Sequence, residues 1–195
     1  MGHLHFFNVP AIIQQFKATT LVETGTGMGF GVFFATLCPF RQIISIEIME
    51  QELVRLRRAF AMEPRVVLLA GNSIDVLRQI LPQINSPILF WLDAHYPGGD
   101  LLLQPYDAEN DPVKRLPLEM ELQLIKELRP QNKDVILIDD LRIYERDNWG
   151  WGNLDDPLFQ RLVKYDSGFL YTIFKDTHTA QRFLEHSGYL ALTPK

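Results

Sequence analysis

Short apolar runs alternate with longer stretches of helical periodicity along almost the whole chain. Runs rich in Val, Ile and Leu predict buried strands, whereas apolar residues spaced three or four positions apart predict helices. Strands are predicted at residues 21–23, 42–48, 66–70, 88–92, 135–138, 169–174 and 189–193. Helices are predicted at residues 10–16, 30–37, 51–60, 73–81, 118–128 and 157–164.

This alternation of strands and helices predicts an α/β fold. Because the strands read as nearly continuous apolar runs, we expect a doubly wound, mostly parallel sheet with helices on both faces. The last two predicted strands lie close together in the sequence, which favours an antiparallel pair at one edge. The chain has no internal repeat, low-complexity tract or linker, so we expect a single domain over residues 1–195.

Three alternating glycines follow an acid at the end of the first strand, in Glu23-Thr24-Gly25-Thr26-Gly27-Met28-Gly29. Glycine adopts positive φ angles and lets a ligand lie against bare backbone, so this spacing indicates a turn built around a bound molecule. The dinucleotide motif Gly-x-Gly-x-x-Gly does not fit, because its third glycine would fall on Phe30. A P-loop does not fit either, because no Gly-Lys-Ser or Gly-Lys-Thr follows.

Ligands of open α/β sheets bind beyond the carboxyl ends of the strands, so the residues at those ends form one set of candidates. Glu47 ends the second strand about 20 residues beyond the glycines, where an acid binds ribose hydroxyls in such folds. The alternative for Glu47 is an exposed acid that caps the next helix. Asn72 and Ser73 follow the third strand, and a plain turn with a helix cap explains them almost as well.

Acids also follow the fourth and fifth strands, as Asp93 and as the pair Asp139 and Asp140, and His95 lies two residues after Asp93. Adjacent strands lie about 4.8 Å apart, so these carboxylates are expected to converge and to repel one another unless a cation neutralises them. Carboxylate oxygens suit Mg²⁺ or a similar divalent ion. Imidazole titrates near neutrality, so His95 is the candidate general base. The alternatives are aspartates that cap turns and a histidine hydrogen-bonded within its loop.

The pattern acid-x-Gly-x-Gly-x-Gly from Glu23 to Gly29 resembles the first motif of class I S-adenosylmethionine-dependent methyltransferases. This resemblance implies a Rossmann-like seven-stranded sheet with an antiparallel last strand. It also implies that Glu23 anchors the methionine end of the cofactor and that the segment after the third strand contacts the adenine ring. The implied cofactor-binding residues are Glu23, Thr24, Gly25, Thr26, Gly27, Gly29, Glu47, Asn72, Ser73 and Asp93.

The Asp…Asp-Asp pattern is similar to the metal site of magnesium-dependent O-methyltransferases such as the catechol and macrocin enzymes. The likeness implies that Asp93, Asp139 and Asp140 hold Mg²⁺ or a similar ion, which binds the acceptor oxygen and lowers the pKa of its hydroxyl. It also implies that His95, just after the first metal aspartate, is the base. The expected activity is S-adenosylmethionine-dependent methylation of a small hydroxylated metabolite. Residues 97–117 and 146–156, with Trp149 and Trp151, are expected to form the substrate lid.

Composition narrows the possible partners and the compartment. The net charge of −5 disfavours a nucleic-acid partner, which would need a basic face. The apolar runs are too short to span a bilayer, and no amino-terminal secretory signal is visible, so no membrane partner is expected. A single cysteine, Cys38, fits the reducing cytoplasm.

Two other functions fit the same residues. The first is a nucleotide-binding Rossmann-like protein with hydroxylase-like or NAD-dependent chemistry, against which the failed dinucleotide spacing argues. The second is a non-catalytic protein that keeps the S-adenosylmethionine pocket without methyl transfer. Only the acids after the fourth and fifth strands and His95 argue against it.

Overall fold

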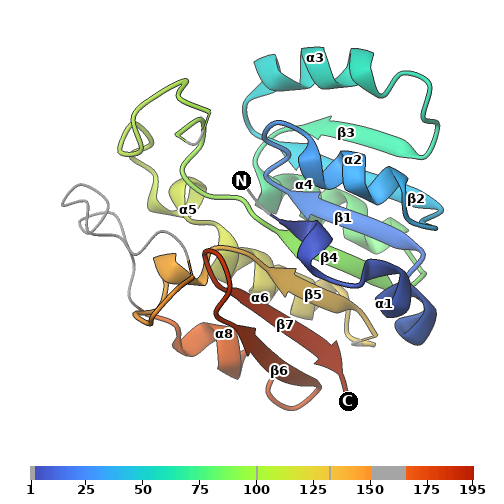
Figure 1. The fold of residues 1–195 in the computed structure, drawn as a ribbon, viewed down its shortest axis with the longest axis vertical. Helices are drawn as coiled ribbons and strands as arrows, with labels where there is room; N and C mark the ends of the chain where they lie inside the picture. Colours follow the sequence, from blue (N-terminus) through green and yellow to red (C-terminus); the bar gives the residue numbers. More distant parts are fainter. Residues whose placement is uncertain (1–2, 100, 132, 151–165) are drawn as a thin grey trace.

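The computed structural model describes residues 3–99, 101–131, 133–150 and 166–195. In these residues, seven strands form one sheet in the order β3-β2-β1-β4-β5-β7-β6 (Figure 1). The strands are β1 (Thr20–Thr24), β2 (Gln42–Glu47), β3 (Val66–Ala70), β4 (Ile88–Leu92), β5 (Val135–Ile138), β6 (His178–Phe183) and β7 (Tyr189–Pro194). The first five pair in parallel, and β7 runs antiparallel to both β5 and β6. The predicted mostly parallel sheet with an antiparallel last strand is confirmed.

Helices cover both faces of the sheet, as the continuous apolar strands predict. The helices are α1 (Val9–Phe16), α2 (Phe30–Thr36), α3 (Glu50–Ala59), α4 (Ser73–Ile80), α5 (Pro112–Arg115), α6 (Leu118–Leu128) and α8 (Gly168–Thr172). Short 3-10 turns lie at Leu4–Phe6, Leu81–Gln83 and Leu141–Ile143. In Figure 1, α1 and α2 lie in front of the sheet, and α4 and α6 lie behind it.

Neighbouring residues of each central strand enter different halves of the core. On β1, Val22 packs on the side of α4 and α6, whereas Leu21 packs on the side of α1 and α2. Phe90 and Leu89 of β4 divide in the same way. All four side chains are fully buried, so the strands hold their register through apolar contacts on both faces. The carboxyl ends of the parallel strands therefore meet at a fixed edge of the sheet.

The strand predicted at residues 169–174 is wrong, because most of this segment forms α8. The buried residues there are Phe169, Leu170 and Phe174, which is a helical spacing and not the every-second-residue spacing of a strand. The hydroxyl of Thr172 donates a hydrogen bond to the carbonyl of Gly168 at 2.9 Å, a contact that joins successive helical turns. The aromatic and β-branched residues of this segment favoured a strand in the prediction. The segment forms a helix because its apolar residues pack as one stripe.

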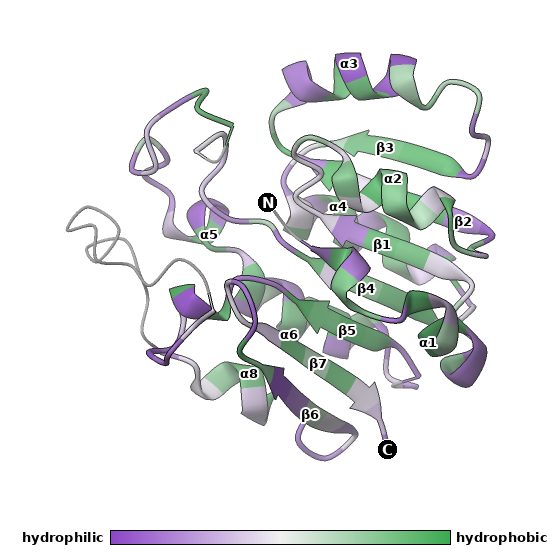
Figure 2. Cartoon of the chain, viewed as in Figure 1, coloured by the Kyte–Doolittle hydropathy of each residue, from purple (hydrophilic) through white to green (hydrophobic). Residues whose placement is uncertain are grey.

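The sixth strand is β6, which the sequence analysis did not predict because its residues are mostly polar. It is the most hydrophilic strand of the sheet (Figure 2), and its residues from Thr179 to Arg182 are exposed. As an edge strand it pairs with β7 alone, so it needs no apolar face of its own. The helix predicted at residues 157–164 lies outside the described residues. Within the described residues, no helix has the length and apolar character to cross a membrane.

Gly31 lies in the first turn of α2, directly beside the buried carboxyl of Glu23. A Cβ at position 31 would overlap Oε1 of Glu23, so this position accepts glycine because of the space that the carboxyl takes and not because of its φ angle. Gly27 is the opposite case, since it has a φ of 49° and no atom within 4 Å of a Cβ. The two glycines are therefore required for different physical reasons.

We predict that Gly31→Ala destabilises the protein by about 2–4 kcal/mol, because the added methyl must displace Glu23 from its buried position. The matched variant Gly27→Ala should cost only about 1–2 kcal/mol, the usual strain of a left-handed residue. Urea unfolding followed by circular dichroism measures both values. Equal losses for the two variants would show that Glu23 can move aside and would contradict the steric account.

Candidate functional site

A cleft that is open to solvent lies at the carboxyl ends of β1 to β4. Its walls are the glycine loop after β1, Glu47 at the end of β2, residues 71–73 after β3 and residues 93–98 after β4. β1 has β2 on one side and β4 on the other, so the chain leaves this central position in both directions. Such a switch in strand order is where open α/β sheets bind ligands. The cleft therefore lies at the carboxyl ends of the strands, where the sequence analysis expects a ligand to bind.

The glycine loop is shaped by left-handed backbone. Gly25, Gly27 and Gly29 have φ angles of 81°, 49° and 83°. A Cβ on Gly25 would lie 2.6 Å from the carbonyl oxygen of Asp93, so the loop after β1 rests directly on the loop after β4. The space beside Gly27, which has no atom within 4 Å of its Cβ position, leaves room for a ligand against the backbone.

Glu23 is a buried carboxyl group at the base of the glycine loop. Its side chain is 2% exposed, and Ser45 of β2 donates a hydrogen bond to Oε2 at 2.5 Å. Burial raises the pKa of Glu23 to about 8, with a smaller contribution from the nearby carboxylates of Asp93 and Glu47. A cationic group in the cleft would favour ionised Glu23.

Glu47 is held in one orientation by the backbone around it. Its Oε2 accepts from the amide of Gly27 at 2.9 Å, and its Oε1 accepts from the amide of Met49 at 2.9 Å. The residue is 6% exposed and lines the cleft, so it does not fit the alternative of an exposed acid. Two carboxylate oxygens retain lone pairs for further donors such as vicinal hydroxyls.

The other predicted cofactor residues divide into two groups. Thr26, Asn72 and Ser73 line the cleft, and the side chain of Asn72 also caps α4 by accepting from the amide of Ile74 at 2.9 Å. Thr24 and Gly29 do not line it. The Thr24 hydroxyl points away toward α6, and Gly29 is the cap residue just before α2.

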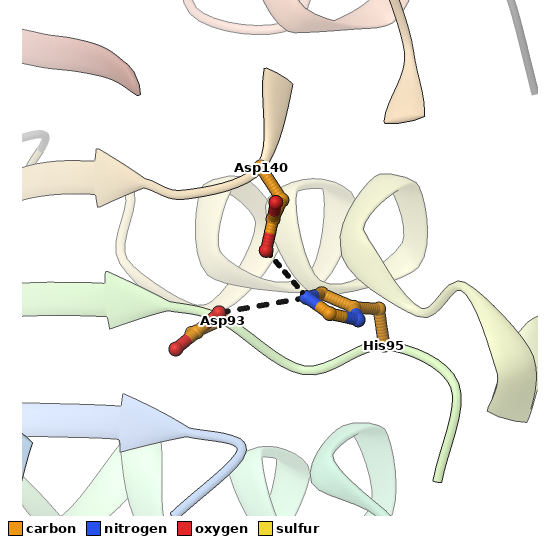
Figure 3. Close-up of side chains that lie close together, drawn as sticks. All are labelled: Asp93, His95 and Asp140. Carbon is orange, nitrogen blue, oxygen red and sulfur yellow. Dashed lines mark hydrogen bonds and ion pairs between the residues drawn. The ribbon is translucent and has the colours of Figure 1, made fainter. Parts of the chain in front are cut away.

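Asp93, His95 and Asp140 come together where β4 and β5 end (Figure 3). Nε2 of His95 lies 2.8 Å from Oδ2 of Asp140 and 3.6 Å from Oδ1 of Asp93. One ligand atom from each residue lies within 4.8 Å of the other two. Oδ1 of Asp140 accepts from Nε of Arg142 at 2.6 Å.

The ionisation of these acids differs with their partners. Burial raises the pKa of Asp93 more than the hydrogen bond to His95 lowers it. Burial also opposes ionisation of Asp140, but His95 and Arg142 together outweigh it and hold the pKa of Asp140 well below its usual range. Asp140 is therefore ionised between the imidazole of His95 and the guanidinium of Arg142.

Asp139 is buried beside this group of three but belongs to a different set of contacts. Its Oδ1 accepts from the amide of Asp140 at 2.7 Å and from the hydroxyl of Ser187 at 2.9 Å. Its Oδ2 has no hydrogen-bond partner among the described residues. Burial, followed by the charges of Asp140 and Asp93, raises its pKa well above the usual value. The structure thus groups Asp140, and not Asp139, most closely with Asp93 and His95.

The segment of residues 97–117 contributes Pro97, Gly98, Leu101, Lys114 and Pro117 to the cleft wall. Among the described residues that line the cleft, Lys114 is the only lysine or arginine.

Trp149 does not line the cleft; its side chain is 6% exposed and packs on Gly188 in the core. The role expected for Trp149 in a lid therefore does not match its position. Trp151, expected to join it there, lies outside the described residues.

Two buried polar residues of this region escaped the sequence analysis, although their positions carried a signal. Ser45 interrupts the apolar run of β2, and Glu121 falls on the apolar stripe of α6. A polar residue at a core position needs a partner, and here the partners are Glu23 for Ser45 and Thr24 for Glu121.

The chain has the fold of class I S-adenosylmethionine-dependent methyltransferases. A candidate caffeoyl-CoA O-methyltransferase of Staphylococcus aureus superimposes on 100% of this chain and 85% of its own, with a TM-score of 0.63 and 13% identity. The methyltransferase domain of bacterial CtHen1-C covers 95% of this chain and 94% of its own, with a TM-score of 0.57 and 13% identity. A candidate methyltransferase of Streptococcus mutans in complex with SAH covers 95% and 98%, with a TM-score of 0.55 and 12% identity. No protein-family model and no curated protein sequence matches the chain.

We predict that the stability of the protein depends on pH through Glu23. Because burial raises its pKa to about 8 from 4.5 in the unfolded chain, the folded state keeps a proton that the unfolded state releases. The contribution is complete below about pH 4.5 and is lost as the pH rises through about 8. Between these values, the free energy of unfolding should fall by up to about 1.4 kcal/mol per pH unit more steeply in the wild type than in Glu23→Gln. Urea titrations at several pH values measure this difference, and equal slopes would contradict it.

Proposed function

We propose that this chain is an S-adenosylmethionine-dependent O-methyltransferase that acts on a small hydroxylated metabolite with the help of a divalent cation. The observation that carries the proposal is the contact between two halves of one cleft. The glycine loop and Glu47 form one half of the cleft, and Asp93 and His95 belong to the other half. The two halves touch where Gly25 packs against the backbone of Asp93. A group bound along the loop would therefore reach the acids at the ends of β4 and β5.

The cleft residues offer the groups that S-adenosylmethionine needs. The fixed carboxylate of Glu47 can accept from the two ribose hydroxyls, and the bare backbone at Gly27 leaves space for the ligand chain. We assign the adenine to Asn72 and Ser73 and the methionine end to Glu23, all three of which line the cleft. We assign the cofactor contacts to this set, with Gly25, Thr26 and Asp93.

The charge of the cleft favours the same ligand over a dinucleotide. Glu23, Glu47 and Asp93 all line it, with Lys114 as the single lysine or arginine among its described lining residues. S-adenosylmethionine carries a sulfonium and an ammonium, which these carboxylates attract, whereas the diphosphate of NAD would be repelled. The solved SAH complex of the Streptococcus mutans protein, which has the same fold, supports this choice.

The acids also fit a divalent cation. Asp93 and Asp140 bring two carboxylates together, and the unpartnered Oδ2 of Asp139 is a third buried oxygen beside them. Three acids at one place are costly without a positive charge, and Mg²⁺ or Mn²⁺ prefers such oxygen donors. A bound cation would polarise the acceptor hydroxyl. We assign Asp93, Asp139 and Asp140 as its ligands.

His95 is suited to remove the acceptor proton. It lines the cleft and lies 2.8 Å from the ionised Asp140, whose charge favours the imidazolium that forms when a proton is taken. S-adenosylmethionine supplies an electrophilic methyl group for the acceptor oxygen. The protein contributes by holding the hydroxyl in line with that methyl and by accepting its proton on His95.

We predict that the wild type binds S-adenosylhomocysteine (SAH) and does not bind NAD in isothermal titration calorimetry. Glu47→Gln should weaken SAH binding by roughly 10- to 100-fold, because the ribose hydroxyls lose a charged acceptor. The matched control Glu50→Gln, an exposed acid three residues away at the start of α3, should bind like the wild type. Saturable NAD binding without SAH binding would overturn the proposed function.

We further predict that Mn²⁺ binds the ligand-free protein, as followed by the loss of its free electron paramagnetic resonance signal. Asp93→Asn and Asp139→Asn should each weaken Mn²⁺ binding at least about tenfold, since each removes an anionic oxygen. Asp75→Asn, an exposed acid on α4, serves as the control. His95→Gln should keep Mn²⁺ affinity within about threefold. Loss of Mn²⁺ binding in His95→Gln would make His95 a ligand and remove it as the base.

A further inference from the structure

Tyr96 is a buried aromatic residue with a left-handed backbone, directly after the proposed base His95. Its φ is 39°, and it is only 1% exposed although it borders the cleft. A bulky side chain at positive φ is strained, because its Cβ crowds the backbone. Glycine would adopt this conformation without strain. The fold therefore keeps a tyrosine where the backbone alone favours glycine.

Two backbone hydrogen bonds hold Tyr96 in this conformation. Its amide donates to the carbonyl of Arg115, the last residue of α5, at 2.9 Å. Its carbonyl accepts from the amide of Gly99 at 2.8 Å, which closes a turn immediately after His95. Strain that the surrounding contacts keep in place is typical of functional sites. Because the turn itself needs no aromatic side chain, the ring of Tyr96 requires a separate explanation.

The ring of Tyr96 contacts two other rings edge to face. Its centroid lies 5.5 Å from the imidazole of His95 and 5.6 Å from the ring of Tyr106, with interplanar angles of 68° and 82°. Tyr106 in turn packs closely on Gly99, where a Cβ would lie 2.7 Å from its ring. The three rings thus form one connected group, in which Tyr106 supports Tyr96 and Tyr96 supports His95.

The acids beside His95 fix one atom of its ring. Asp140 lies 2.8 Å from Nε2, and Asp93 lies 3.6 Å from the same nitrogen (Figure 3). Contacts at one nitrogen set its position but leave the ring able to tilt about that point. A general base needs one orientation toward the proton that it removes. A second ring packed against the imidazole restricts this tilt.

We propose that Tyr96 is a positioning residue that fixes the plane of the His95 imidazole, with Tyr106 as its support. This inference rests on the proposed function, because it takes His95 as the base. The left-handed backbone at position 96 turns the chain so that the side chain of Tyr96 meets the ring of the preceding residue. Tyr96 acts on the reaction through its contact with His95.

The first test is nuclear magnetic resonance of the imidazole nitrogens in ligand-free protein labelled with ¹⁵N-histidine, at neutral pH. The signals of His95 are identified by their loss in His95→Gln. Tyr96→Gly accepts the left-handed backbone but removes the ring, so the Nε2 proton of His95 should exchange with water at least about tenfold faster. Tyr96→Phe keeps the ring and should stay within about threefold of the wild type. Unchanged exchange in Tyr96→Gly, or equal acceleration in both variants, would overturn the proposal.

The second test reaches His95 from a residue outside the cleft lining. The added methyl of Gly99→Ala would press on the ring of Tyr106 and on the Tyr96 carbonyl, which lies 3.1 Å from the Cβ position. This variant should speed exchange of the Nε2 proton at least about threefold. The matched control Gly168→Ala on α8 meets its nearest atom at 3.7 Å and should have no effect. Wild-type exchange in Gly99→Ala would overturn the supporting role of Tyr106, and it decides the test if Tyr96→Gly does not fold.

Calorimetry of SAH and the Mn²⁺ titration separate positioning of His95 from a general loosening of the cleft. Gly99→Ala should keep both affinities within about threefold of the wild type, because Gly99 lies outside the cleft lining. Weakened binding of both ligands would contradict a role confined to His95. Failure of the proposed function would show itself separately, as a wild type that does not bind SAH. The exchange measurements use ligand-free protein, so they decide the orientation of His95 in either case.

Discussion

The site depends on hydrogen bonds that continue the parallel strand pairing one residue beyond the strands. The amide of Asp93 donates to the carbonyl of Thr24 at 3.1 Å, and the amide of Asp139 donates to the carbonyl of Leu92 at 3.1 Å. The amide of Gly25 donates to the carbonyl of Ile46 at 3.0 Å in the same way. Each acid or glycine is thus fixed by the strand beside it. The apolar core on both faces fixes the strands, and the strands in turn fix the positions of the acids and glycines at their carboxyl ends.

Much of this arrangement could be read from the sequence, because it follows from buried strands whose ends are marked by acids and glycines. β3, β4, β5 and α6 have the predicted bounds, and the cleft lies at the predicted edge. The sequence could not separate the roles of Asp139 and Asp140, because adjacent residues point in directions that only the backbone fixes. Asp140 has a φ of 54°, and this left-handed turn sends its carboxylate toward His95 while Asp139 bonds to Ser187. Partners as distant in sequence as Ser187 leave no local pattern.

The cleft concentrates negative charge where burial makes charge costly. Burial raises the pKa values of Glu23, Asp93 and Asp139, and a cation bound beside them would favour the ionised form of each. Asp140 differs, because its contacts with His95 and Arg142 already favour its ionised form. The region therefore contains acids whose ionisation burial opposes and a cationic ligand would favour, together with one carboxylate, Asp140, that its own partners keep ionised. Ligand binding and proton release are coupled at such a site.

The polar edge strand β6 has a consequence for the behaviour of the protein in concentrated solution. An unpaired strand edge is a template on which strands of other molecules can add, and apolar, flat edges are the most prone to do so. β6 presents Thr179, Gln181 and Arg182 to solvent, and Arg182 pairs with Glu145 at 2.9 Å and Asp147 at 2.7 Å. A second chain would have to desolvate these charged groups in order to extend the sheet. The same hydrophilic sequence that hid the strand from prediction thus protects this edge against aggregation.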